Sequence, residues 1–276
     1  MVLSVNTNVS AAIALQNLES TNRSLSNTQN RISTGLRIGS AKDNAAVYAI
    51  AQNERADVGA LDAIKQSVQR AISVTDIALA AGETVSDLLV QLKETAVAAN
   101  DPSLDSFSRQ ALNEDFQALL RQIQTSVDNA TFDGANLINN SLTQGLTVLA
   151  DSEAANTITV GSENLSTGGP LLTLSVTSSV LTLTQAATSL SQLNTSLANV
   201  NSALARLGSS GKALETHLVF VGKLQDTLVG GIGNLVDADL AEESARLQAL
   251  QVKQQLGAQA LSIANQSPQI VLSLFQ

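Results

Sequence analysis

The chain has 276 residues, which is enough for one or two domains with a sizeable apolar core. Only 2% of the residues are aromatic, so the core must be aliphatic, as in close-packed long helices, and a ring-lined ligand pocket is not expected. The net charge of −9 argues against nucleic acid as a partner, and the lack of cysteine excludes disulfides and thiolate metal sites.

The first 40 residues combine a seven-residue apolar repeat with only four charged side chains. One row of residues seven apart comprises Ala11, Leu18, Leu25 and Ile32. A second row, with a polar middle, comprises Leu15, Asn22, Gln29 and Leu36. A sustained heptad favours a coiled coil, and polar positions in its seam fix the register at some cost in stability. The segment is therefore predicted to be a helix that needs a partner.

Two further helices are predicted before residue 130. The first runs from Asp43 to about Ala99 and ends before Asp101-Pro102, because proline disfavours the helical conformation of the residue before it. It repeats apolar residues every seven positions, at Ile64, Ala71, Ala78, Val85, Leu92 and Ala99. The second runs from about Ser106 to Asn129, with an apolar stripe at Leu112, Phe116, Leu119 and Ile123. The sequence TFDGANL, residues 131–137, predicts a turn after it.

Residues 142–184 have a different character and predict a small β region. The runs 146–148 and 157–160 are rich in β-branched and aliphatic residues. Leu172, Leu174 and Val176 alternate with hydroxyl residues at a period of two, which indicates another strand. Gly168-Gly169-Pro170 marks a turn or a break.

A long helical repeat returns from Gln185 to Gly230. Its apolar positions, each seven apart, are Leu193, Val200, Leu207, Leu214, Val221 and Leu228. The repeat passes through Gly208-Ser209-Ser210-Gly211 without a change of phase, so the helix is predicted to continue there although each glycine weakens it by about 1 kcal/mol. The glycines at 230–233 predict a hinge before a C-terminal helix, and all three prolines are expected outside the long heptads.

The last 23 residues contain no ionisable side chain. Leu256, Ile263 and Ile270 are seven apart, and Leu250, Gly257, Ala264 and Val271 form a neighbouring row. A surface helix of a soluble monomer would carry charge on its outer face, whereas this one carries Gln, Asn and Ser. We expect the two chain ends to pair with each other and to be covered in an assembly. Two amphipathic helices of one ordinary globular bundle are the alternative.

The order of elements predicts a mainly α fold. Long heptad helices would form an elongated antiparallel bundle, with coiled-coil helices at the chain ends and the small β region at the mid-chain tip. Residues 1–40 and 235–276 would form one discontinuous domain, and residues 41–234 would form the other, with the β region at about 142–184.

Candidate catalytic residues are few. His217 is the only histidine, which excludes a histidine cluster, and a flanking or surface role on its helix is the simpler interpretation. Asp237, Asp239, Glu242 and Glu243 stand at a helix start, where acids complement the helix dipole. No phosphate-binding glycine motif occurs, no apolar run is long enough to span a membrane, and no classical signal peptide is recognised. The sequence predicts no enzyme, cofactor or metal.

Five motifs, read together, carry a family resemblance. They are SVNTNVSAAIALQNL (4–18), GLRIGSAKDNAAVYAI (35–50), TFDGANL (131–137), LVDADLAEESARLQALQVKQQ (235–255) and ALSIANQSPQIVLSLF (260–275). In order and position they resemble the conserved ends of bacterial flagellins, in a short form without large outer domains. The resemblance covers about residues 1–140 and 185–276 and leaves the β region unmatched.

The resemblance implies a structural subunit of the extracellular flagellar filament, used for motility and exported without a cleaved signal peptide. It implies terminal helices that form an inner tube, with Ala11, Leu18, Leu25, Ile32, Leu36, Leu256, Ile263 and Ile270 at the assembly interface. Implied partners are other flagellin subunits, possibly sister flagellins, together with the type III export apparatus, an export chaperone, the filament cap and hook–filament junction proteins. Nucleic acid and membrane insertion are not expected.

Two other functions remain open, a hook–filament junction protein and a flagellin with a catalytic insert. The ending PQIVLSLF and the complete AKDNAAVYAI segment favour the filament subunit. The resemblance also suggests altered immune recognition. An Arg, a Leu and a Glu that engage the innate flagellin receptor in many flagellins align with Gln91, Thr95 and Asp115.

Overall fold

The computed structural model describes residues 7–273 and the side chains of residues 7–266. Its helices are α1 (Val9–Thr34), α2 (Ala45–Ala99), α3 (Ser106–Asn129), α4 (Leu183–Val236) and α5 (Leu240–Ser273). Two short strands, β1 (Leu146–Leu149) and β2 (Thr157–Val160), form one antiparallel hairpin. The fold is therefore mainly α with a small β region, as predicted. The chain divides into a terminal unit, residues up to 56 and from 227 onward, and a central unit, residues 57–226.

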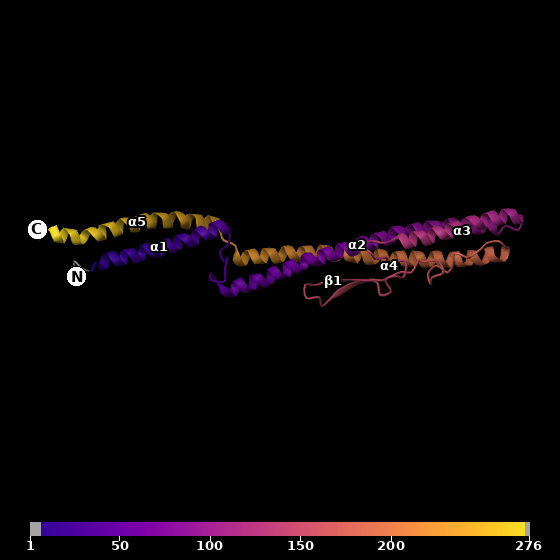
Figure 1. Ribbon diagram of the computed structural model, residues 1–276, viewed down its shortest axis with the longest axis horizontal. Coiled ribbons are helices and arrows are strands. Elements are labelled where there is room, and N and C mark those ends of the chain that lie inside the picture. Colours follow the sequence, from indigo (N-terminus) through magenta and orange to yellow (C-terminus); the bar gives the residue numbers. More distant parts are fainter. Residues whose placement is uncertain (1–6, 274–276) are drawn as a thin grey trace. The chain divides into compact units, whose positions relative to one another are not determined.

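In the terminal unit α1 and α5 lie side by side and antiparallel (Figure 1). The side chain of Asn8 caps α1 by accepting a hydrogen bond from the Ala11 N–H. Gly35 ends α1 with a φ of 72°, a left-handed conformation that glycine adopts at little cost. Next to it, Leu36 pairs through its backbone with Asp237, the residue that follows α4. The turns at one end of the helix pair are thereby joined.

The loop between α1 and α2 is held by the carboxylate of Asp43. Its Oδ2 atom accepts hydrogen bonds from the backbone N–H groups of Gly39 and Ser40 and from the Ser40 hydroxyl. The bonds from Ser40 lower the pKa of Asp43, so the carboxylate that closes this turn is ionised at neutral pH. The next residue, Asn44, accepts a hydrogen bond from the Val47 N–H at the start of α2. The AKDN sequence thus starts the second helix.

The central unit has an aliphatic core along α2, α3 and α4. The heptad positions predicted on α2 are all buried, and so are those on α4 from Leu193 to Val221. From α3 the core receives Phe116, Leu120, Ile123 and Val127. The helices α2 and α4 approach closely at Gly82, where an added Cβ would lie 2.5 Å from Leu204 Cδ2. Because Gly82 has no side chain, the Leu204 side chain of α4 can pack directly against α2 at this point.

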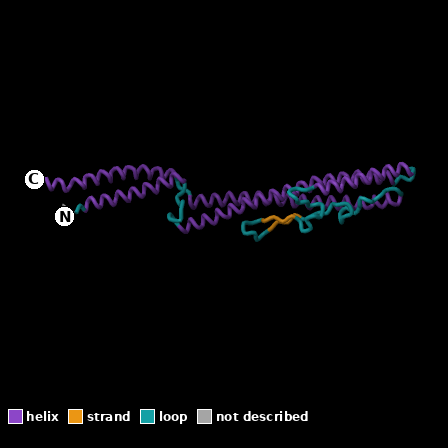
Figure 2. Tube along the Cα trace, viewed as in Figure 1, coloured by secondary structure: helices purple, strands orange, loops and turns teal. Residues whose placement is uncertain are grey.

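Three details differ from the sequence predictions. The period-two run at 172–176 forms no strand, although Leu172 and Leu174 are buried as an alternating pattern requires (Figure 2). Within the run, the Thr173 N–H donates to Ser196 Oγ of α4 and the Leu174 carbonyl accepts from the Gly168 N–H. Just before the run, Asn199 Nδ2 of α4 donates to the Leu171 carbonyl. Alternating burial was read correctly, but it does not require a sheet.

The other two differences concern helix ends. Glycines 230–233 make no hinge, since α4 runs through them to Val236. Likewise, α5 continues past Pro268 to Ser273, so this proline lies inside a long helix. At the glycines the apolar repeat, with Ile232 and Val236 buried, outweighs a helix propensity that is about 1 kcal/mol less favourable for each glycine than for alanine.

Candidate assembly surface

The apolar row predicted on α1 faces α5. Its residues Ala11, Leu18, Leu25 and Ile32 are all half-buried, and Leu36, just after the helix, is half-buried too. On α1 the half-buried or buried positions, apart from Arg31 beside the seam, follow alternating steps of three and four: Ala11, Ala14, Leu18, Thr21, Leu25, Thr28 and Ile32. This spacing is that of a coiled-coil seam. It confirms the prediction that the two chain ends pair with each other.

On α5 the seam is the neighbouring row and not the row of Leu256. Its half-buried or buried positions are Glu243, Leu247, Leu250, Gln254, Gly257, Leu261 and Ala264. At Gly257 the backbone comes close to Leu18, because an added Cβ would stand 3.3 Å from Leu18 Cδ1. Leu256 and Ile263 point away from the seam and are 58% and 67% exposed. The side chain of Ile270 lies outside the described residues.

Polar contacts fix the register of this helix pair at three levels. Asn8 Nδ2 donates to the carbonyl of Ala264 at 2.7 Å, and Gln254 Nε2 donates to Asn22 Oδ1 at 2.8 Å. At the third level Arg31 Nη1 lies 2.9 Å from Glu243 Oε1. These levels run in opposite directions along the two helices, as an antiparallel pair requires.

Glu243 has a role in the seam that the sequence analysis did not identify. It does stand in the first turn of α5, as predicted, but its side chain is only 7% exposed. It also pairs with Arg246 on its own helix, at 3.4 Å. Its Oε2 atom is buried and has no hydrogen-bond partner among the described residues. Any slip of the two helices would leave this carboxylate buried without Arg31, which is costly. The sequence offered one indication of this role, because Glu243 lies seven residues before Leu250 on the row that forms the seam.

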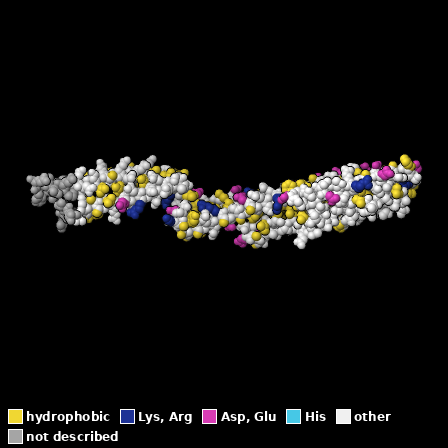
Figure 3. Space-filling model, in the orientation of Figure 1, with side chains coloured by type: hydrophobic (Ala, Val, Ile, Leu, Met, Phe, Trp, Pro, Cys, Tyr) yellow, Lys and Arg dark blue, Asp and Glu magenta, His cyan; other side chains and the backbone are white. Residues whose placement is uncertain are grey.

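The distal part of the helix pair, residues 7–18 at the start of α1 and residues 254–266 of α5, contains no charged side chain. We call it the uncharged end. Five large aliphatic side chains of this end are exposed: Val9, Ile13, Leu15, Leu256 and Ile263. The face visible in Figure 3 likewise shows apolar side chains on the terminal pair and few charges. Large exposed apolar side chains gathered on an end without charge favour an interaction site.

The remaining candidates offer no chemistry that the structure assembles. His217 is half-buried on α4, with its ring centroid 6.0 Å from that of Phe220, and its Nε2 has no hydrogen-bond partner among the described residues. Within the described part of the chain, no three His, Asp or Glu side chains are grouped as metal ligands. Asp239 caps α5 by accepting from the N–H groups of Ala241 and Glu242. None of the described helices has the length and apolar character needed to cross a bilayer.

The three receptor-motif positions lie on two helices of the central unit. Gln91 and Thr95 are one turn apart on α2, where the Thr95 hydroxyl donates to the Gln91 carbonyl at 3.0 Å. Asp115 is exposed on α3. Because Thr95 bonds back to its own helix, it presents no apolar side chain at the place where the aligned residue is Leu.

Comparison with known proteins settles the family. Residues 5–143 match the family profile of the bacterial flagellin N-terminal helical region, and residues 190–275 match that of the bacterial flagellin C-terminal helical region. The chain belongs to the flagellin family. It is 52% identical over 273 residues to flagellin FljM of Caulobacter vibrioides, covering 99% of this chain and 98% of that one. It is 36% identical over 281 residues to a flagellin of Brucella melitensis, covering 99% of both.

A solved structure shares the fold. A putative flagellar hook-associated protein from Vibrio parahaemolyticus matches with a TM-score of 0.59 at 13% identity, over 71% of this chain and 100% of that one. As a flagellin, the protein is a structural component of the extracellular flagellar filament, which consists of flagellin subunits.

Proposed function

We propose that this flagellin polymerises through its terminal coiled coil, and that the outward rows of the uncharged end are the contacts between subunits. The observation that carries the proposal is the exposure of Leu256 and Ile263 in a stretch without charge. A helix pair that stayed in water would gain solubility from charge on this face, whereas a packed tube would exclude charge because desolvation is costly.

The two rows of each helix then have separate roles. The inward row contributes to the pairing of α1 with α5; it comprises Ala11, Leu18, Leu25, Ile32 and Leu36. Any contact that these residues make with other subunits is an additional role. Leu256 and Ile263, with Ile270 on the same repeat, remain for other copies. Residues 1–40 and 235–276 would form the inner tube and residues 41–234 the outer tube. Sister flagellins with the same uncharged end could occupy the same lattice.

The family resemblance supports the remaining parts of the proposal. Export through the flagellar type III apparatus without a cleaved signal peptide, an export chaperone, the filament cap and the hook–filament junction proteins are proposed as its cellular partners. The protein is proposed to have no enzymatic activity and no cofactor. The hook–filament junction role is less well supported, since the likeness to a hook-associated protein is one of fold.

The experiment is polymerisation of the purified protein on filament seeds, followed by electron microscopy and limited proteolysis. Long tubes are expected. In these tubes the terminal segments should resist a protease that trims them in the dilute monomer, because an isolated helix pair with Thr, Gln and Gly in its seam is only marginally stable. Equal protection of the ends in monomer and polymer would contradict the proposed core, and failure to polymerise would favour the junction role.

A further inference from the structure

A polar pocket lies in the terminal unit, on one side of the seam between α1 and α5. Its volume is about 390 Å³. It is lined by Ser24, Asn27, Thr28 and Arg31 of α1 and by residues of α5 that include Arg246 and Lys253. Three of these side chains are cations, although the chain as a whole has a net charge of −9.

The end of the pocket at Lys253 has no acid to neutralise it. Residues 20–30 of α1 and 247–266 of α5 carry two charged side chains, Arg23 and Lys253, and both are positive. Glu19, one residue before this stretch, is exposed and does not line the pocket. Lys253 forms no ion pair among the described residues. A concave surface with an uncompensated cation attracts anions.

At the other end of the pocket the acids are already engaged. Glu243 Oε1 lies 2.9 Å from Arg31 Nη1 and 3.4 Å from Arg246 Nη1. Glu242 Oε1 lies 3.0 Å from Arg246 Nη2. The acids of the adjoining turns accept hydrogen bonds as well; these acids are Asp43 and Asp239. Because the guanidinium of Arg31 donates to described residues through Nη1 alone, its other N–H donors stay available.

The wall of the pocket holds a threonine whose hydroxyl has no partner. Thr28 is only 3% exposed, and its hydroxyl makes no hydrogen bond to another described residue. Two other hydroxyls of α1 bond back to their own helix: Thr21 donates to the Asn17 carbonyl at 2.9 Å, and Ser24 donates to the Ser20 carbonyl at 3.0 Å. Polar groups as buried as Thr28 are normally hydrogen-bonded, so its free hydroxyl points to a ligand in the pocket.

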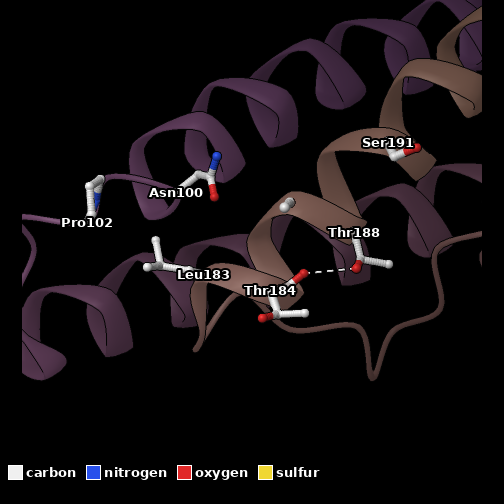
Figure 4. A pocket seen from close by; sticks show the side chains of 7 residues that line it. Asn100, Pro102, Leu183, Thr184, Thr188 and Ser191 are labelled. Carbon is white, nitrogen blue, oxygen red and sulfur yellow. Dashed lines mark hydrogen bonds between the residues drawn. The ribbon is translucent and has the colours of Figure 1, made fainter.

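A larger open pocket in the central unit lacks both features (Figure 4). It has a volume of about 780 Å³ and lies between Asn100 and Pro102 on one side and the first turns of α4 on the other, and no charged side chain lines it. Its Thr188 hydroxyl is used within the helix, where it donates to the Thr184 carbonyl at 2.8 Å. The cations and the free hydroxyl are therefore particular to the pocket of the terminal unit.

We propose that the pocket of the terminal unit binds a tetrahedral oxyanion such as inorganic phosphate, and that the bound anion stabilises the pairing of α1 with α5. Lys253 on one helix and Arg31 with Thr28 on the other donate from different sides. This arrangement suits an anion with several oxygen atoms and more than one negative charge, whereas a carboxylate has two oxygens in one plane and a single charge. Because the donors come from both helices, the anion binds the paired state and favours pairing by mass action.

Amide hydrogen exchange of the full-length monomer, with inorganic phosphate added at constant ionic strength, tests the site. Exchange in α1 and α5 should slow in a saturable manner, by about tenfold at ten times the dissociation constant. Exchange in α2, α3 and α4 should stay unchanged, which separates binding at the pocket from the general stabilisation of folded proteins by phosphate. Acetate at the same ionic strength should slow the exchange of α1 and α5 much less.

Three variants locate the effect. K253Q, which removes the uncompensated charge, should need at least about tenfold more phosphate for the same slowing. T28V should slow the exchange of α1 and α5 in the absence of phosphate, because a buried unpaired hydroxyl is replaced by a methyl group, and yet should weaken the response to phosphate. R23Q removes the same charge from an exposed position outside the pocket and should respond like the wild type. The proposal would be overturned by a wild-type protein without saturable slowing, or by an equal response of the wild type, K253Q and T28V.

Discussion

Replacing Ile263 by Asp separates the folding of the chain from its assembly. Ile263 is 67% exposed in the single chain, and it lies outside the seam between α1 and α5. Ile and Asp differ by only a few tenths of a kcal/mol in helix propensity. The monomer of I263D should therefore show a near wild-type thermal unfolding curve.

In a filament that covers this face, the same substitution is severe. About two-thirds of the side chain remains to be buried, which corresponds to about 1.5 kcal/mol of lost hydrophobic stabilisation per subunit. Desolvation of the carboxylate, or the proton uptake that avoids this desolvation, adds a further cost of several kcal/mol. At about 1.4 kcal/mol per factor of ten, the critical concentration should rise by about a thousandfold or more. Sedimentation of polymer grown on wild-type seeds measures this directly.

Two matched variants give the result its meaning. I263V keeps an aliphatic side chain and should assemble almost normally. L261D puts the same charge into the half-buried seam two residues away, so it should weaken the α1–α5 pair in the monomer as well. If I263D assembled like the wild type, the uncharged end would not be part of the polymer core, and the proposed assembly surface would be wrong.

Three further predictions test the fold, the register and the altered receptor motif. G208A, whose Cβ meets nothing within 4 Å, should stabilise the helix by about 0.5–1 kcal/mol. G82A should stabilise it less, because its Cβ would have to displace Leu204 Cδ2, and calorimetry compares the two variants. R31M should destabilise the terminal pair by about 1–3 kcal/mol, because Glu243 stays buried with Arg246 alone. Amide hydrogen exchange in α1 and α5 should then be faster than in the wild type. The changes at the three receptor-motif positions should leave activation of reporter cells weak, and a response equal to that of an enteric flagellin would contradict the alignment.

The helices could be predicted from the sequence because their signals are redundant. The α2 repeat from Ile64 to Ala99 is long, and the boundary at Asp101-Pro102 is marked by backbone chemistry. The predicted bounds of the third helix, Ser106 and Asn129, agree with those of α3. Where two signals conflicted, the repeat decided: glycines 230–233 suggested a hinge, yet the helix continues because the packed face on either side of them stays in phase.

The β region was predicted only in part, for a physical reason. The runs at 146–149 and 157–160 pair with each other, and the Thr147 and Thr159 hydroxyls interact at 3.2 Å across the hairpin. The run at 172–176 alternates as well, but what bonds to its backbone depends on what lies beside it. Here that neighbour is a helix that offers Ser196 and Asn199 side chains. No local pattern encodes such a neighbour.

The assembly surface shows the same limit more sharply, because α5 carries two apolar rows that are each spaced by seven. Sequence alone cannot tell which row meets α1. The selection comes from a residue without a side chain: at Gly257 the backbone comes close to Leu18, so the row of Leu250, Gly257 and Ala264 turns inward. The row of Leu256 and Ile263 is then left exposed to water. Complete burial of each side chain would stabilise the protein by about 2 kcal/mol. A helix pair that gains its register from Arg31 and Glu243 does not need these side chains for its own pairing, so their exposure supports the proposed contacts with another copy.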